Sequence, residues 1–161
     1  MGKLKDGFNK VTEVELIYRN KMPQSEQRQI CSSLDAYELL DSSWDKGKME
    51  LQEQFKIMLL DRKNSCLGVS LIATGGVSEC MVDSKILFAT ALKARASGII
   101  LAHNHPSGAK KFSDADKSLT RKFAEAAKLL DINILDHLVL TADGYVSLSD
   151  QGEMPAIHLK L

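Results

Sequence analysis

The chain has 161 residues, a formal net charge of zero and 44% hydrophobic residues. This length and composition predict one folded domain with its own core and exclude a disordered or fibrous protein. Because 21 Lys and Arg residues balance 21 Asp and Glu residues, strong non-specific binding to nucleic-acid phosphates is not expected. The apolar runs, such as residues 98–102, are too short to span a bilayer.

The sequence also predicts a cytoplasmic protein. Its first residues lack the apolar core of a signal peptide. The cysteines are odd in number and form no Cys-x-x-Cys pair, which argues against a disulfide framework and favours a reducing compartment. They are Cys31, Cys66 and Cys80.

The first half of the chain predicts one short strand, one helix and one β-hairpin. Strands are indicated by alternating or continuous apolar residues, and the helix by a serine cap before spaced apolar positions. In chain order these are a strand at 14–18, a linker at 21–29, a helix from Ser32 or Ser33 to about Trp44, and a hairpin of residues 55–60 and 67–73.

The second half alternates two amphipathic helices with strands. The first helix opens at Ser84 and carries Ile86, Leu87, Ala91, Leu92 and Ala94 on its apolar face. The second covers residues 114–130, with Leu119, Phe123, Ala126, Ala127 and Leu130 as its stripe. The strands are residues 99–102, 132–140 and 145–148. This order predicts an α/β domain with a mixed β-sheet flanked by helices.

The candidate chemistry lies where the strand 99–102 leads into the second helix. His103 and His105 flank one residue, and residues two apart in a strand point to the same side. Asp116 falls in the first turn of the helix, so a short loop can bring its carboxylate back to the imidazoles. Two imidazoles and one carboxylate form a zinc ligand set that leaves a fourth position open, which is typical of catalytic sites.

The residues alone leave simpler interpretations open. A His-x-His pair also occurs in proteins that bind no metal. Ser113 followed by Asp116 fits a helix N-cap with an acid at the third helical position, which is a helix start and nothing more.

The spacing of His103, His105, Ser113 and Asp116 resembles the motif of the JAMM (JAB/MPN) zinc metallopeptidases. The string His-Asn-His-Pro-Ser-Gly that begins at His103, together with Leu-Asp-His-Leu-Val-Leu at 135–140, resembles the bacterial RadC branch of that superfamily.

This resemblance covers roughly residues 32–151. It implies a single JAB/MPN-like, cytidine-deaminase-like domain at 31–161 that follows an amino-terminal extension at 1–30. It also implies hydrolysis of an amide or isopeptide bond in a peptide or protein substrate, with one Zn²⁺ per chain.

The resemblance assigns a role to each motif position. His103, His105 and Asp116 are the expected zinc ligands. Glu53, which precedes a core strand, is the expected general base. Ser113 is the expected hydrogen-bond donor to the oxyanion of the tetrahedral intermediate.

Several of these assignments have alternatives. Glu53 is alternatively a solvated acid before a strand. Glu13 and Glu79 are the less favoured candidates for the general base. His137 lies in an apolar strand and is either a hydrogen-bonded core histidine or, with Asp136, a residue that orients a metal ligand.

Two other function classes compete with the hydrolase. The family association with DNA repair and a locally basic stretch raise DNA as a partner, although such charges usually form a solvated helix face. A non-catalytic MPN-type interaction scaffold is the third hypothesis, and a homodimer stays open. The basic residues are Lys110, Lys111, Lys117, Arg121 and Lys122.

Overall fold

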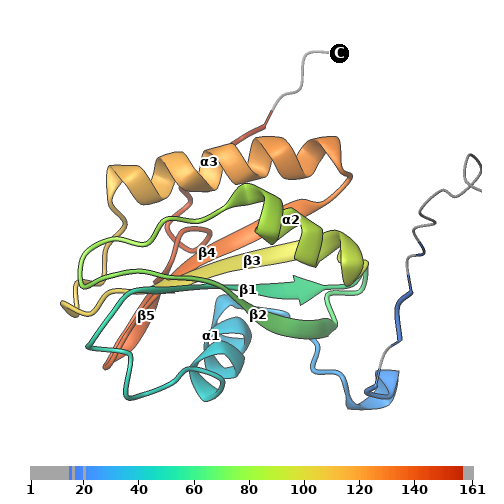
Figure 1. Cartoon of the computed structure of the whole chain (residues 1–161), viewed down its shortest axis with the longest axis horizontal. Helices are drawn as coiled ribbons and strands as arrows, with labels where there is room; N and C mark the ends of the chain where they lie inside the picture. Colours follow the sequence, from blue (N-terminus) through green and yellow to red (C-terminus); the bar gives the residue numbers. More distant parts are fainter. Residues whose placement is uncertain (1–14, 16, 20, 158–161) are drawn as a thin grey trace, which may run out of the picture.

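A five-stranded mixed sheet forms the centre of the fold in the order β2-β1-β3-β4-β5 (Figure 1). The computed structural model describes residues 15, 17–19 and 21–157. The strands are β1 (Gln54–Leu60), β2 (Cys66–Thr74), β3 (Gly98–Asn104), β4 (Asn133–Thr141) and β5 (Gly144–Ser147). The helices are α1 (Ser33–Ser42), α2 (Ser84–Lys93) and α3 (Asp114–Leu129), with a single 3-10 turn at Gln24–Glu26.

Strand pairing explains which elements lie at the centre. β1 pairs antiparallel with β2 and with β3, β3 pairs parallel with β4, and β4 pairs antiparallel with β5. Helix α3 is the crossover that a parallel pair requires. Every residue of β1 and β3 is buried, which accounts for their nearly continuous apolar sequences.

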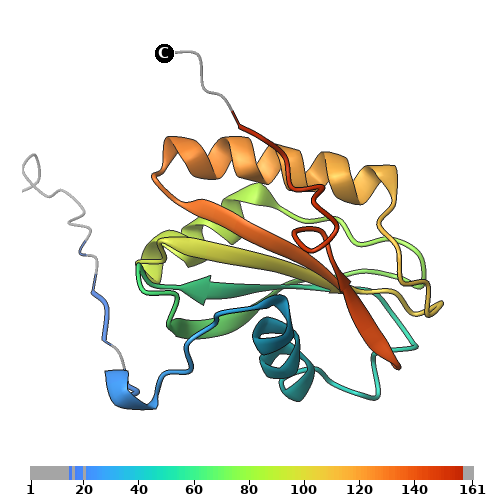
Figure 2. The ribbon, with the colours of Figure 1, turned by 180° about the vertical axis from the view of Figure 1, so that it is seen from behind.

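The helices cover both faces of the sheet. Helices α2 and α3 lie on one face and α1 lies on the other, as the two opposite views show (Figures 1 and 2). Side chains alternate along β1, so the strand contributes to two cores. The first core includes Phe55, Ile57, Leu59, Leu87, Phe88, Ile99, Leu101 and Phe123. The second includes Ala36, Leu40, Met58, Leu60, Ile100, Ala102, Leu138 and Leu140.

The predicted α/β class with a mixed sheet flanked by helices is confirmed, and so is each helix and strand predicted from Ser32 onward. The strand predicted at 14–18 is not: Glu15 and residues 17–18 are not in a strand, while Val14 and Leu16 lie outside the described residues. The predicted linker at 21–29 contains the 3-10 turn, and Gln29 forms a bridge with Ser65.

Three predicted core positions are wrong. Ile86, Leu92 and Leu130 are exposed. The buried stripe of α2 contains the predicted Leu87 and Ala91 together with Phe88, which was not predicted. A short helix on one face of a sheet buries only a narrow stripe. Leu130 follows the last residue of α3 and is its C-cap.

Among the described residues, none of the helices combines the length and apolar character needed to cross a membrane.

Candidate metal centre

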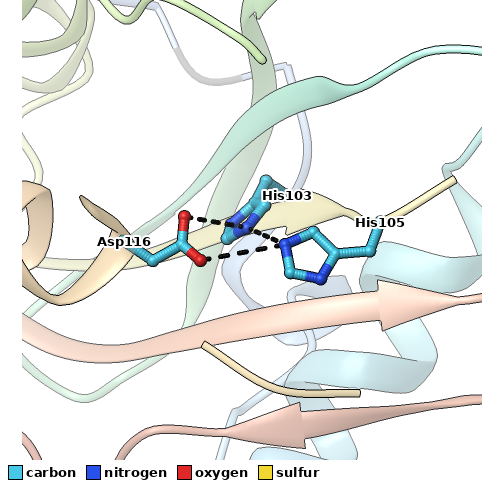
Figure 3. A group of neighbouring side chains, drawn as sticks. All are labelled: His103, His105 and Asp116. Carbon is cyan, nitrogen blue, oxygen red and sulfur yellow. Dashed lines mark hydrogen bonds and ion pairs between the residues drawn. The ribbon is translucent and has the colours of Figure 1, made fainter. Parts of the chain in front are cut away.

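Three predicted ligands meet at the end of the sheet where β3 leads into α3 (Figure 3). The Nε2 atoms of His103 and His105 lie 3.0 Å apart. His103 Nε2 lies 3.3 Å from Asp116 Oδ1, and His105 Nε2 lies 3.8 Å from Asp116 Oδ2. β3 is longer than predicted and includes His103, which pairs with Phe55 on one side and Val139 on the other. The first ligand is therefore fixed by the centre of the sheet.

The loop after β3 turns back on itself to place His105. The Gly108 N–H donates to the carbonyl of His105 at 3.0 Å, and Gly108 has a φ of 79°, a left-handed conformation that favours glycine. The turn also brings the carbonyl of Ala109 to 2.8 Å from His105 Nδ1. A carbonyl only accepts, so His105 carries its proton on Nδ1 and presents a lone pair at Nε2.

A buried relay sets the proton of His103 in the same way. Thr120 donates its hydroxyl proton to the carbonyl of Asp116 at 2.7 Å and so accepts from His137 Nδ1, also at 2.7 Å. His137 is fully buried, and burial lowers its pKa well below the ordinary value, so the ring is neutral. Its Nε2 then accepts a proton from His103 Nδ1 at 2.8 Å. In a neutral His103 ring, Nε2 is therefore the nitrogen left free to bind a metal ion, and it faces His105 and Asp116. Without a metal ion, a proton on this nitrogen can instead be shared with Asp116.

The donor set fits a metal ion on physical grounds. Two imidazole lone pairs and a carboxylate repel one another at these separations unless a shared proton or a metal cation lies between them. Ligands about 2.0–2.1 Å from a tetrahedral zinc ion lie about 3.3 Å from each other. The separations of 3.0 Å between the two Nε2 atoms and 3.3 Å between His103 Nε2 and Asp116 Oδ1 are close to that distance, and His105 Nε2 lies 3.8 Å from the other carboxylate oxygen. His103, His105 and Asp116 are therefore the residues that could hold a divalent ion.

Asp116 serves the helix and the site at once. Its Oδ2 accepts the Ser113 N–H at 2.7 Å, and the Ser113 hydroxyl accepts the Asp116 N–H at 3.1 Å, which completes a capping box at the start of α3. Burial acts to raise the pKa of Asp116, but interactions with His103 and Ser113 outweigh it and hold the pKa well below its usual range. The helix start and the metal-site interpretation are thus compatible.

Glu53 lies in the segment just before β1 and lines the same cavity as the three ligands. The cavity has a volume of about 910 Å³. The pKa of Glu53 is raised above its ordinary value, mainly by burial. The charges of Asp116 and Glu79 also raise this pKa, and His103 opposes the shift. Glu79, a less favoured candidate for the general base, also lines the cavity, and Glu13 lies outside the described residues.

The two remaining predicted residues, His137 and Asp136, differ in whether they contact a predicted metal ligand. His137 contacts the ligand His103. Asp136 accepts hydrogen bonds from Ser147, Ser149 and the backbone of His137. None of these bonds reaches His103, His105 or Asp116. Asp136 therefore stabilises the β4–β5 region.

The basic stretch is partly paired. Lys110 lies 3.6 Å from Asp143, and Lys117 forms an ion pair with Glu153. Part of the positive charge that suggested DNA contact is therefore neutralised within the chain.

Sequence reasoning missed two residues of this region, Thr120 and Asn104. Thr120 is fully buried within α3. A polar residue on the buried side of an amphipathic helix is the signal that identifies it in the sequence. Asn104 stands between the two histidines, but its partners are 50 and more residues away.

Known proteins share this region of the chain. A family model described as "RadC-like JAB domain" matches residues 30–153. A UPF0758 protein of Flavobacterium johnsoniae is 36% identical over 125 residues, which are 78% of this chain and 53% of that protein.

Similar proteins occur in archaea and other bacteria. The UPF0758 protein Mbar_A2303 of Methanosarcina barkeri is 35% identical over 126 residues, 78% of this chain and 54% of that protein. The UPF0758 protein STH371 of Symbiobacterium thermophilum is 38% identical over 100 residues, 62% of this chain and 43% of that protein. The chain thus spans about half the length of the curated relatives it matches.

Proposed function

The chain belongs to the RadC-like JAB domain family, and from this premise we propose that it is a zinc-dependent hydrolase of amide or isopeptide bonds. The observation that carries the proposal is the convergence of three metal-binding groups in an open cavity that also contains a half-buried glutamate. The substrate is a peptide or protein that offers such a bond to this cavity.

His103, His105 and Asp116 would hold the zinc ion. Bound zinc supplies Lewis acidity, which polarises a carbonyl and acidifies water. The relay through His137 and Thr120 keeps the proton of His103 on Nδ1, so that Nε2 stays free for coordination.

Glu53 would take a proton from the attacking water and deliver it to the departing amine. A carboxyl group with a raised pKa is suited to this exchange, because its proton affinity lies closer to that of its partners near neutral pH. The side chain lines the cavity beside the ligands, where such a water would lie.

Ser113 would stabilise the oxyanion. Its oxygen accepts the Asp116 N–H, and its own hydroxyl proton has no role in that bond. Ser113 lines the cavity, so the proton can be donated towards negative charge that develops on a substrate carbonyl.

The experiment compares zinc-loaded wild type with Glu53→Gln. Both are incubated with a mixture of linear peptides and lysine isopeptides, and new amines are identified by mass spectrometry. We expect cleavage by the wild type only, with equal zinc content in both proteins. Cleavage that persists in Glu53→Gln contradicts the assigned base, and failure of the wild type to bind zinc contradicts the proposal as a whole.

A further inference from the structure

Asn104 separates the two histidine ligands but faces away from them. Residues that alternate along a strand point to opposite sides, and Asn104 is the last residue of β3, paired with Leu140 of β4. The residue is fully buried. A buried amide must satisfy its hydrogen bonds within the protein, so its partners show what it holds in place.

All of the partners of this side chain lie in the segment that leads into β1. Asn104 Oδ1 accepts the Gln54 N–H at 2.8 Å. Asn104 Nδ2 donates to the carbonyl of Met49 at 2.8 Å and to that of Gln52 at 3.0 Å. One amide therefore binds three backbone groups of residues 49–54, and two of them flank Glu53.

The opposite edge of this segment is held by the loop that follows β2. The Glu53 N–H donates to the carbonyl of Gly76 at 2.8 Å, and the Glu53 carbonyl accepts the Gly75 N–H at 2.8 Å. The backbone of Glu53 is thus hydrogen-bonded on one side, and its two neighbours are bonded by Asn104 on the other.

We propose that Asn104 is a positioning residue that fixes Glu53 relative to the metal ligands. The end of β3 presents His103 to the ion and, one residue later, the amide that anchors the segment of the general base, and His105 follows directly. The inference rests on the proposed function for the role of Glu53. It assigns to the central residue of His-Asn-His a task different from that of the histidines.

The ligands have their own supports. His103 is paired within the sheet with Phe55 and Val139, and the His105 N–H donates to the carbonyl of Leu140 at 2.9 Å. Loss of the Asn104 amide therefore affects the segment of Glu53 more than the geometry of the ligands.

The test uses the metal-free full chain and the variant Asn104→Ser, whose side chain is too short to reach residues 49–54. The pKa of the Glu53 carboxyl is followed by NMR, and exchange of the Gln54 amide is measured in parallel. We expect the pKa to fall towards its ordinary value as the side chain becomes more exposed. Gln54 exchange should accelerate about tenfold relative to the β3 amides, and the zinc dissociation constant should change by less than about tenfold.

Thr141→Val is the matched control. Thr141 is also buried and bonds Asp143 and Gly144 within the turn between β4 and β5. The substitution removes two partly buried hydrogen bonds of a buried residue without touching the segment of Glu53. The control should leave the Glu53 pKa and Gln54 exchange unchanged, whereas a merely structural effect would move both variants alike. His103, Asp116 and Glu79, which act on the Glu53 carboxyl, are retained in both proteins.

Two results overturn the inference. One is a folded Asn104→Ser protein with wild-type Glu53 pKa and Gln54 exchange, and the other is equal shifts in Thr141→Val. If Asn104→Ser does not fold, exchange in the wild type decides, since a Gln54 amide that exchanges as fast as exposed loops contradicts the anchor. The Glu53 pKa and the Gln54 exchange rate are measured without substrate or metal. Failure of the hydrolase proposal is therefore detected separately.

Discussion

Two carboxylates, the partly buried Asp116 at the start of α3 and the buried Asp136 in β4, have opposite surroundings. Asp136 accepts three hydrogen bonds, from the Ser147 hydroxyl at 2.6 Å and from the amides of His137 and Ser149 at 2.7 and 2.9 Å. The Oδ1 of Asp116 instead lies 3.3 Å from His103 Nε2, the nitrogen that the relay leaves free to bind a metal ion. Asp136 is therefore satisfied by protein donors, whereas the Asp116 oxygen that faces the imidazoles needs a shared proton or a metal cation between them.

The largest expected difference between the two acids is in metal binding. Asp116→Asn removes an anionic ligand and should weaken zinc binding by at least about 100-fold, the upper range for loss of a residue that only supports a ligand. Isothermal titration with zinc checks this. Asp136→Asn is the control and should change the dissociation constant less than about threefold. Similar losses in both variants would mean that the distinction between them is wrong.

The next effect concerns the free energy of unfolding, to which Asp136 should contribute more than Asp116. Asp136→Leu leaves the Ser147 hydroxyl and two amides without their acceptor, which should cost about 2–3 kcal/mol of unfolding free energy. Chemical denaturation of the metal-free proteins measures it. A loss below 0.5 kcal/mol, on the order of a typical surface substitution, would contradict the structural role of Asp136.

A smaller effect is expected from the relay behind His103. Thr120→Val preserves shape but removes the acceptor for His137 Nδ1. His137 can then move its proton to Nε2, which forces the proton of His103 onto the nitrogen that faces the site. Zinc binding should weaken about tenfold, and ¹⁵N shifts of His103 should report the changed tautomer. An unchanged tautomer together with unchanged affinity would show that the relay has no influence on the ligand.

The smallest expected effect is a pH dependence of stability in the metal-free protein. The pKa of Asp116 in the folded chain lies below that of the unfolded chain, about 3.9. Its contribution to stability is therefore present above about pH 4 and is lost as the pH falls through the folded-state value. Asp116→Asn should be more destabilising at pH 5 than at pH 3 in urea denaturation. The reverse order would contradict the lowered pKa.

The sequence predicts much of this site because its key residues are local. His103, His105 and Asp116 lie within fourteen positions and take their arrangement from one strand, one turn and one helix start. The alternation of a strand and the capping of a helix are both readable from residue types.

What the sequence does not predict depends on distant contacts. Thr120 and His137 come together only because α3 packs against β4, and Asn104 reaches back to Met49 and Gln54 only because β1 and β3 are neighbours. Likewise, spaced apolar residues predict that α2 is amphipathic, but the sheet it meets decides which of them are buried.

The most direct test of the central claim is anomalous diffraction at the zinc edge from crystals grown with zinc. We expect one peak about 2.0–2.2 Å from Nε2 of His103, Nε2 of His105 and one carboxylate oxygen of Asp116. Ordered side chains in these positions under excess zinc, with no peak between them, would contradict it.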